Sequence, residues 1–424
     1  MLVLKRLSSG MKKNICRISG KKLTPFIDLG NQYVSDFVSK EYIYDVDRSS
    51  LKVGYCSKSK LAQLYTTYSQ EKMYKKYWYK SGINETMINE LKNIVHDCIL
   101  YKSLKTNDVV LDIASNDGTL LKNYDSDLKK IGIDPSDVAK RSNVYKEKNF
   151  TLINDFFSKS SYFKKTKKKA SIVTIIAMFY DLENPIKFLK DLREVIMEDG
   201  IGVIQISYTP LMLEQNEFGF ISHEHLCYFT LANLKSLLEK CGFYLFDVKL
   251  NSSNGGSIRV FFTPNHQLLS FPENLKMIGK FRLNSILNYE IKKKINNKST
   301  YLNFKKRIDI LKYQTLKWLY SQKKNGKKVI GYGASTKGNV LLQYYGINSD
   351  LLPFIAERSI EKHGLYTAGT GIEIISEEEM RKMKPDYLFA LPWFFINSFL
   401  KREKNLIENG TRFVVPQPVL KIIK

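Results

Sequence analysis

Two histidines flank a glutamate at positions 223–225, which concentrates acid–base side chains in one short segment. His223 and His225 are two of the five histidines in the chain. A histidine has a pKa near neutrality that its surroundings readily shift, and a neighbouring acid such as Glu224 can orient it. The segment therefore predicts a general base. Metal binding and a purely structural role are the alternatives, and adjacent positions on an extended strand disfavour the metal because they do not face one side.

An acidic loop at 112–118 predicts a ligand site of a different kind. Small residues at 114, 115 and 118 let a ligand approach the backbone closely. Asp134 ends the next apolar run, about 22 residues after Asp112. An acid at that place can accept hydrogen bonds from ribose hydroxyls. The loop lacks the glycine triad that a pyrophosphate prefers, so it favours an adenosine-containing ligand without phosphates and with a positive charge. An ordinary turn is the alternative.

A second glycine-rich loop follows an apolar run at 328–330 and reads Gly331-Tyr332-Gly333-Ala334-Ser335-Thr336-Lys337-Gly338. Backbone amides at the start of a helix, together with the Lys337 ammonium, suit a phosphate group. A turn that serves only the fold is the alternative interpretation.

These segments need a sheet to position them, and the apolar runs predict one. Short runs separated by helical stretches are typical of a parallel, doubly wound α/β sheet. We expect helices over 86–104, from Thr119, and from Asn184-Pro185, where proline suits the first helical turn. The expected strands are 109–113, 131–134, 172–176 and 202–206, with further strands near 387–391 and 412–415.

The net charge of +25 is large, but it does little to identify the ligand. Lysine runs such as 164–169 and 292–294 are interpreted as solvated faces, because charge bears on solubility more than on fold. No zinc-finger spacing, RNP-like aromatic motif or basic-region helix accompanies them, which disfavours nucleic acid as a partner. No apolar run approaches a membrane span of roughly 20 residues. Five cysteines at irregular spacing favour a reducing compartment, so we expect a cytoplasmic protein.

The sequence as a whole resembles the sugar C-methyltransferase family. The string from Leu111 to Leu121 looks like the adenosylmethionine loop of that family. Its members methylate nucleotide-linked deoxyketosugars in antibiotic and surface-polysaccharide pathways. The resemblance begins near residue 14 and covers nearly all of the chain after it. Its further markers are Ser222-His223-Glu224-His225, Asn254-Gly255-Gly256-Ser257, the loop from Gly331 to Asn339, and Leu391-Pro392-Trp393.

The resemblance implies three parts after an N-terminal extension at 1–13. These are a small zinc-binding type of module at 14–85, a class I (Rossmann-like) methyltransferase domain at 86–266, and a Rossmann-like domain at 267–424 that helps to hold a sugar nucleotide. The fold class is therefore expected to be α/β throughout the two larger parts.

The resemblance also assigns S-adenosyl-L-methionine to the first loop. Asp112 and Asp134 would flank the methionine and ribose parts of this cofactor, and Asp155 with Phe156 would lie near its adenine. The Phe156-Phe157 pair has core packing as an equal alternative. The remaining cofactor-binding residues are expected to be Ala114, Ser115, Asn116, Asp117 and Gly118.

For catalysis the resemblance implies that His225 removes a proton beside a sugar carbonyl, and that the resulting enolate accepts the methyl group. Glu224 would position the base or the substrate, while His223 and Tyr79 complete the expected catalytic set. Core packing is an equal alternative for the tyrosines. The expected substrate-binding residues are Ser222, Tyr77, Asn254, Gly333, Ser335 and Lys337.

Two departures from the family pattern leave the methyl acceptor open. Ser222 stands where the family has a tyrosine, and Met178 stands where it has a second histidine. Methyl transfer to nitrogen or oxygen of a sugar is therefore an alternative. A non-catalytic partner that binds sugar nucleotides, and an RNA methyltransferase suggested by the charge, are further alternatives.

The N-terminal zinc site of the family is incomplete in this sequence. Its two Cys-x-x-Cys pairs correspond here to Cys16 with Ser19 and to Cys56 with Ser59. Serine is a poor zinc ligand, and two thiolates do not complete a tetrahedral structural site. We therefore expect no bound metal in this module.

Overall fold

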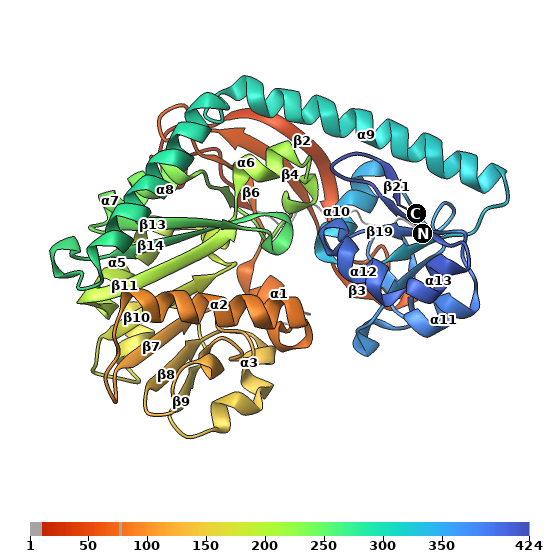
Figure 1. The fold of residues 1–424 in the computed structure, drawn as a ribbon. Coiled ribbons are helices and arrows are strands. Elements are labelled where there is room, and N and C mark those ends of the chain that lie inside the picture. Colours follow the sequence, from red (N-terminus) through yellow and green to blue (C-terminus); the bar gives the residue numbers. More distant parts are fainter. Residues whose placement is uncertain (1–10, 76–78, 424) are drawn as a thin grey trace.

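The computed structural model describes residues 11–75 and 79–423. A seven-stranded sheet forms its central layer, in the order β13-β14-β11-β10-β7-β8-β9 (Figure 1). The five strands from β7 to β11 are parallel, and β14 and β13 extend them as an antiparallel pair at one edge. This confirms the predicted doubly wound sheet and adds the antiparallel edge to it. The strands are β7 (Val109–Ile113), β8 (Lys129–Ile133), β9 (Phe150–Ile153), β10 (Ala170–Ile176), β11 (Ile196–Ser207), β13 (Tyr244–Asn251) and β14 (Ser257–Thr263).

Helices cover both faces of this sheet because successive strand residues point to opposite sides. Val110 packs with α2 (Glu85–Tyr101) on one face, while Leu111 belongs to the core shared with α5 (Pro185–Val195) on the other, where α7 (Leu231–Lys240) also packs. The shorter helices around the sheet are α1 (Gln70–Lys75), α3 (Asp137–Arg141), α4 (Lys159–Phe163) and α6 (Thr209–Glu214), with 3-10 turns at Ser81–Ile83, Asn143–Lys146, Phe179–Asp181, Phe218–Phe220, Ser253–Gly255 and His266–Leu268.

One predicted helix is wrong. The chain after Thr119 forms only a 3-10 turn over Leu121–Asn123. Asp117 accepts hydrogen bonds from the Thr119 amide and hydroxyl, and the Asn123 side chain donates to the Thr119 carbonyl. These side chains take up the backbone groups that an α-helix would need.

The N-terminal module is a four-stranded antiparallel sheet in the order β12-β5-β4-β2. Its outermost strand, β12 (Cys227–Tyr228), comes from the segment just after the predicted base. A two-stranded pair, β1 (Met11–Lys12) with β6 (Thr66–Thr67), lies beside it, so residues 11 and 12 belong to the fold instead of to an extension. The remaining strands are β2 (Thr24–Tyr33), β4 (Arg48–Tyr55) and β5 (Ala62–Leu64).

The C-terminal sheet has eight strands in the order β21-β20-β19-β15-β16-β18-β17-β3. Its last strand, β3 (Phe37–Val38), is contributed by the N-terminal module, after which a 3-10 turn covers Lys40–Tyr42. The other strands are β15 (Val329–Tyr332), β16 (Phe354–Glu357), β17 (Tyr366–Thr367), β18 (Glu373–Ser376), β19 (Tyr387–Ala390), β20 (Arg412–Val415) and β21 (Lys421–Ile423), and the helices are α10 (Thr336–Tyr345), α11 (Glu377–Lys382), α12 (Ile396–Arg402) and α13 (Lys404–Glu408), with 3-10 turns at Ile360–Lys362 and Trp393–Phe395.

Two long helices join the sheets. α8 (Glu273–Lys292) packs on β13, and α9 (Lys298–Lys324) then runs across the molecule to β15, contacting β2 and α6 on its way (Figure 1). Within residues 11–75 and 79–423, every helix is too short or too polar to cross a membrane.

Candidate active site

A cavity of about 270 Å³ lies beyond the carboxyl ends of β7, β8 and β10. Parallel strands bring their carboxyl ends to one edge of a sheet, so loops far apart in sequence meet there. The lining includes Tyr74, Tyr79 and Ser81 from the segment around α1; Asp112, Ala114, Ser115, Asn116, Asp134, Asp155 and Phe156 from the sheet loops; Met178, Tyr180 and Asp181 after β10; Glu224 and His225; and Asn254, Thr336 and Lys337.

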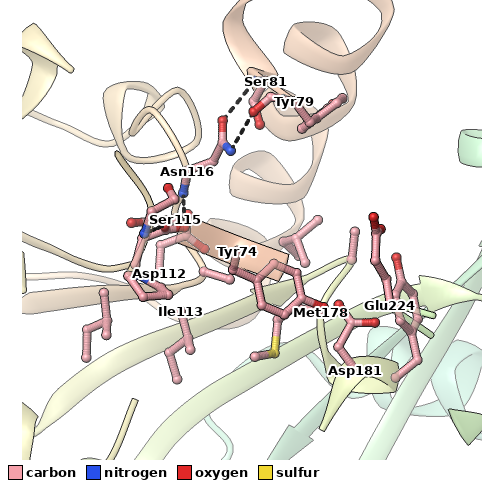
Figure 2. Close-up of a pocket in the computed structure, with 18 of the residues that line it drawn as sticks. Tyr74, Tyr79, Ser81, Asp112, Ile113, Ser115, Asn116, Met178, Asp181 and Glu224 are labelled. Carbon is pink, nitrogen blue, oxygen red and sulfur yellow. Dashed lines mark hydrogen bonds between the residues drawn. The ribbon is translucent and has the colours of Figure 1, made fainter. Parts of the chain in front are cut away.

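The first loop is held open toward this cavity by its backbone. Ala114, Asn116 and Gly118 have φ values of 59°, 50° and 82°, the left-handed region in which small and asparagine residues are best tolerated. The Asn116 amide donates to Asp134 Oδ2 at 2.9 Å, and its side chain bridges to the Tyr79 carbonyl and the Ser81 amide, both at 3.0 Å (Figure 2). Asn116 therefore ties the loop to the segment that follows α1.

Asp112 gives this part of the cavity its electrostatic character. Its side chain is 3% exposed and accepts a hydrogen bond from Thr174 Oγ1 at 2.6 Å. Burial raises its pKa to about 7, and the neighbouring carboxylates of Asp134 and Asp117 contribute to that rise. Such a group gains stability when a cation lies beside it. The site therefore fits a ligand that carries a positive charge.

Not all of the predicted cofactor-binding residues face the cavity. Asp117 turns away, accepting the Gly82 amide at 2.8 Å, and Gly118 packs beneath Val144. Both shape the loop without lining the cavity. Asp155 and Phe156 do line it, and the Phe156 ring is 43% exposed, available for stacking on a flat group.

His225 is the buried imidazole of the cavity. Its Nδ1 lies 2.7 Å from the Phe220 carbonyl oxygen, which can only accept, so Nδ1 carries the proton and Nε2 bears the lone pair. The ring stacks on Phe220 with centroids 4.2 Å apart, and Tyr180 meets it edge-on. Burial, against the opposing hydrogen bond to the Phe220 carbonyl and together with the nearby Lys337 ammonium, lowers the pKa of His225 to about 3. The imidazole is thus neutral at physiological pH.

The position of His223 does not fit the catalytic role that the sequence predicted. Its Nε2 lies 3.0 Å from the Ser49 carbonyl oxygen of β4, so the side chain faces the N-terminal module. Ser222, expected to bind substrate, lies behind the base, with its hydroxyl 3.2 Å from His225 Nδ1. The chain bends over residues 222–224, and the His225 amide donates to the Ser222 carbonyl at 3.2 Å. Glu224 and His225 therefore line the cavity while the two preceding side chains hold the segment in place.

The second glycine loop contributes Thr336 and Lys337 to the lining of the cavity. Lys337 lines it, with its Nζ 2.9 Å from the Asn254 carbonyl oxygen. Gly333 packs against the Pro392 ring, and Ser335 accepts the Gly338 amide as the N-cap of α10. The prediction that Gly333 and Ser335 bind substrate is corrected, because both are occupied within their own domain. Among the other expected residues, Tyr79 and Asn254 line the cavity, and Tyr77 lies outside the described residues.

Asp181 is a cavity residue that the sequence did not single out as functional. It follows β10 directly, and its side chain points toward the Tyr74 ring, with Glu224 close by (Figure 2). A signal was present in the sequence, because an acid just after a buried parallel strand lies at the edge where ligands bind. The family resemblance drew attention to Met178 instead.

Comparisons with known proteins agree with this geometry. A family model described as a methyltransferase domain matches residues 83–248, the segment that carries the seven-stranded sheet. A second model, described as the C-methyltransferase C-terminal domain, matches residues 252–418. The C-methyltransferase NovU of Streptomyces niveus is 26% identical over 380 residues, which cover 88% of this chain and 87% of that protein.

The chain is an S-adenosylmethionine-dependent methyltransferase. The C-terminal match and the curated relative further support a C-methyltransferase family. S-adenosylmethionine fits the residues present, because the buried Asp112 carboxyl, with the Asp134 carboxylate near it, suits the sulfonium charge.

Two solved methyltransferase structures each match less than half of this chain. The plantazolicin methyltransferase BpumL in complex with SAH is 16% identical, with a TM-score of 0.34 over 43% of this chain and 86% of that one. CalO1, a methyltransferase in calicheamicin biosynthesis, is 15% identical, with a TM-score of 0.33 over 42% of this chain and 55% of that one. At these scores the assignment of the methyltransferase rests on the sequence matches.

In the N-terminal module of the methyltransferase, Cys16, Ser19, Cys56 and Ser59 form a cluster. Only two of its four side chains are thiols. Cys16 Sγ lies 3.1 Å from Ser59 Oγ, and Ser19 Oγ lies 3.1 Å from Cys56 Sγ, so all four positions come together. Burial raises the pKa of Cys56, but hydrogen bonds from Ser19, Ser59 and backbone amides outweigh it and bring the pKa to about 7. Two hydroxyls in place of thiolates do not fit a structural zinc ion. Hydrogen bonds link the two turns instead.

Proposed function

We propose that the methyltransferase transfers a methyl group to a carbon of a nucleotide-linked deoxyketosugar, through an enolate that His225 generates. The observation that carries this proposal is the neutral His225 imidazole, whose protonated Nδ1 is fixed on the Phe220 carbonyl oxygen. The other nitrogen, Nε2, is free to accept a proton from carbon. Bound S-adenosylmethionine supplies the electrophilic methyl group.

Glu224 supports this role of His225. Its carboxylate oxygen Oε2 lies 4.0 Å from His225 Nε2, and burial raises the pKa of Glu224 to about 7. An ionised Glu224 stabilises the imidazolium that forms when a proton moves from the substrate carbon to Nε2. This compensates for the low pKa that burial alone gives the histidine. A carbon beside a carbonyl is acidic enough to be the donor only when the resulting negative charge is also stabilised.

Lys337 supports an anionic substrate. Its ammonium lies 4.8 Å from the centroid of the Phe394 ring and 5.5 Å from that of the Phe220 ring. Burial lowers its pKa, with the Glu217 carboxylate acting in the opposite direction. Glu217 itself is hydrogen-bonded to the Trp393 indole. A phosphate beside Lys337 would neutralise this buried charge, as the diphosphate of a sugar nucleotide would.

In this proposed function, the three predicted parts of the chain have different tasks. The module at 14–85 and the domain at 86–266 supply the cofactor loop and the base, and the part at 267–424 supplies Lys337 as an anchor for the nucleotide. Surface-glycan or secondary-metabolite assembly is the setting that the proposed substrate class implies.

Labelled S-adenosylmethionine, incubated with the full chain and a panel of nucleotide-linked ketosugars and aminosugars, tests the proposal. We expect a new C–CH₃ signal in the NMR spectrum of the product, and loss of turnover with retained cofactor binding in His225→Ala. An N–CH₃ or O–CH₃ signal would overturn carbon as the acceptor. Binding of sugar nucleotides without turnover would indicate a non-catalytic partner, and steeply salt-dependent RNA binding would indicate an RNA substrate.

A further inference from the structure

Asp181 is a buried carboxyl group in the cavity to which the proposed mechanism gives no task. It ends the 3-10 turn Phe179–Asp181, and its side chain lines the cavity. Its Oδ1 atom has no hydrogen-bond partner in the described part of the chain. Its backbone carbonyl accepts the Gln70 side-chain amide at 2.6 Å, which fixes the turn. The backbone of the turn is thus fixed, and the Asp181 carboxyl lines the cavity with one buried, unpartnered oxygen.

The surroundings of Asp181 contain acids and phenols. Glu224 and Tyr74 face it most directly, and a hydrogen bond from Tyr74 partly offsets the rise in its pKa that burial and Glu224 cause. Within residues 11–75 and 79–423 no basic side chain forms an ion pair with it. Lys13 pairs with Glu183, and Arg17 donates to the Leu64 carbonyl and the Thr67 hydroxyl. The other titratable side chains nearby are Tyr180, His225, Cys227 and Tyr228.

Two neighbouring carboxyl groups that form no ion pair with a lysine or arginine of the described residues do not both stay charged in an enclosed cavity, and Lys337, on the same lining, donates to the Asn254 carbonyl oxygen. Removing an isolated carboxylate from water costs far more free energy than protonating it. Asp181 and Glu224 therefore carry at least one proton between them. Glu224 lies beside the base, where its negative charge is useful, and Asp181 is the more enclosed member with an unpartnered oxygen. The proton is best placed on Asp181.

We propose that Asp181 works as a neutral carboxylic acid that donates a hydrogen bond to the carbonyl oxygen of the methyl acceptor. This rests on the proposed carbon methylation. As His225 Nε2 takes the proton, the carbon–hydrogen bond breaks and its electron pair moves into the enolate, whose charge gathers on the oxygen. Asp181 keeps its own proton and stabilises that oxygen through the hydrogen bond. Donors aimed at a developing oxyanion contribute strongly in such water-excluded sites.

Carboxyl-carbon NMR of the full chain, with labelled aspartate and glutamate side chains, tests the protonation without any substrate. The Asp181 resonance is the one missing from Asp181→Asn, and it is also the aspartate resonance that shifts most in Glu224→Gln, which identifies it if the first variant fails to fold. We expect a protonated carboxyl at pH 7 and easier ionisation in Glu224→Gln. A resonance that is already ionised at pH 6 would overturn the proposal, whatever the acceptor is.

Turnover of the variants then tests the donor role. Asparagine keeps a hydrogen-bond donor at the same place, so Asp181→Asn should retain at least a tenth of kcat, whereas Asp181→Ala should lose about 100-fold to 1000-fold. The fall in rate at high pH that ionisation of Asp181 causes should disappear in Asp181→Asn. Asp191→Asn, on α5 outside the cavity and paired with Lys187, is the matched control and should behave as the unmodified chain. Equal loss in Asp181→Asn and Asp181→Ala would overturn the donor role. If no acceptor in the panel is methylated while the NMR result holds, the proposed substrate class fails and the protonated Asp181 stands.

Discussion

The two glycine loops of the methyltransferase share one local design but differ in use. In each, an acid at the end of the neighbouring parallel strand accepts a loop amide: Asp134 accepts from Asn116 at 2.9 Å, and Glu357 accepts from Ala334 at 2.8 Å. The first loop borders the cavity. The second is covered by Pro392, which packs against Gly333.

The difference shows that neighbours, more than the loop itself, decide whether such a turn binds a ligand. Glu357 also accepts the amides of Arg358 and Ser359, and Lys362 donates to the Ala334 carbonyl at 2.9 Å. A phosphate at the second loop would therefore meet a carboxylate and a filled space. From this loop Thr336 and Lys337 reach the cavity, whose other lining residues belong mostly to the other domain.

The largest effect should come from removing the acid of each loop in turn. In Asp134→Ala the loop loses the acceptor of the Asn116 and Ser136 amides, and affinity for S-adenosylhomocysteine should fall roughly 100-fold, about 2.7 kcal/mol. Glu357→Ala should leave that affinity unchanged. Isothermal titration calorimetry measures both. A similar loss in the two variants would mean that both loops hold the cofactor, and the contrast between them would fail.

Lys337 of the second loop should affect binding of the substrate and leave binding of the cofactor unchanged. Lys337→Met removes a buried ammonium, so the KM for the nucleotide-linked acceptor should rise roughly tenfold to 100-fold while cofactor affinity stays constant. Lys362→Met is the matched control, because Lys362 lies over the second loop and should leave KM unchanged. Steady-state kinetics at saturating cofactor separates them. An unchanged KM in Lys337→Met would remove the anion-binding role.

The acidic surroundings of the first loop should make cofactor binding depend on pH. A sulfonium cation favours ionised Asp112, whose pKa burial raises to about 7, so binding below that pH must release a proton. The Kd of S-adenosylmethionine should therefore increase roughly tenfold as the pH falls from 8 to 6. Asp112→Asn should flatten this dependence, and uncharged S-adenosylhomocysteine should show less of it. Parallel curves for the two ligands would show that Asp112 does not sense the charge.

The smallest effects should come from the glycines of the two loops. A Cβ at Gly118 would meet Val144 Cγ1 at 2.8 Å, and one at Gly333 would meet Pro392 Cγ at 2.7 Å, with φ near +80° in both. Each substitution to alanine should lower the free energy of unfolding by about 1–3 kcal/mol, seen as a lower Tm. Only Gly118→Ala should also weaken cofactor binding. If Gly333→Ala also weakened cofactor binding, the two loops would be coupled more strongly than their contacts indicate.

The sequence predicted the local design of both loops, four adjacent strands of the central sheet and three strands of the C-terminal sheet, because apolar periodicity and glycine placement are local signals. The sequence did not predict features that depend on side-chain bonds or on residues far away in the chain. The helix expected from Thr119 is replaced by side-chain hydrogen bonds of Asp117, and Gly333 is covered by Pro392 from a segment 59 residues away.

The candidate site shows the same limit. His225 and Glu224 reach the cavity, while His223 is taken by the Ser49 carbonyl of another module. The four adjacent residues 222–225 carry no pattern that reveals which of their side chains will bond to a strand far away in the sequence. Asp181 was overlooked because its importance depends on Glu224, which lies 43 positions later in the chain.

Strand β3 gives the chain a particular order of assembly during synthesis. Phe37 and Val38 pair with Thr367 and Tyr366, which are translated more than 300 residues later. At about 5–20 residues per second, the N-terminal segment waits on the order of tens of seconds for its partner. The C-terminal domain thus closes over a module that is synthesised earlier, and a chain truncated before residue 366 leaves an exposed strand edge where this pairing belongs.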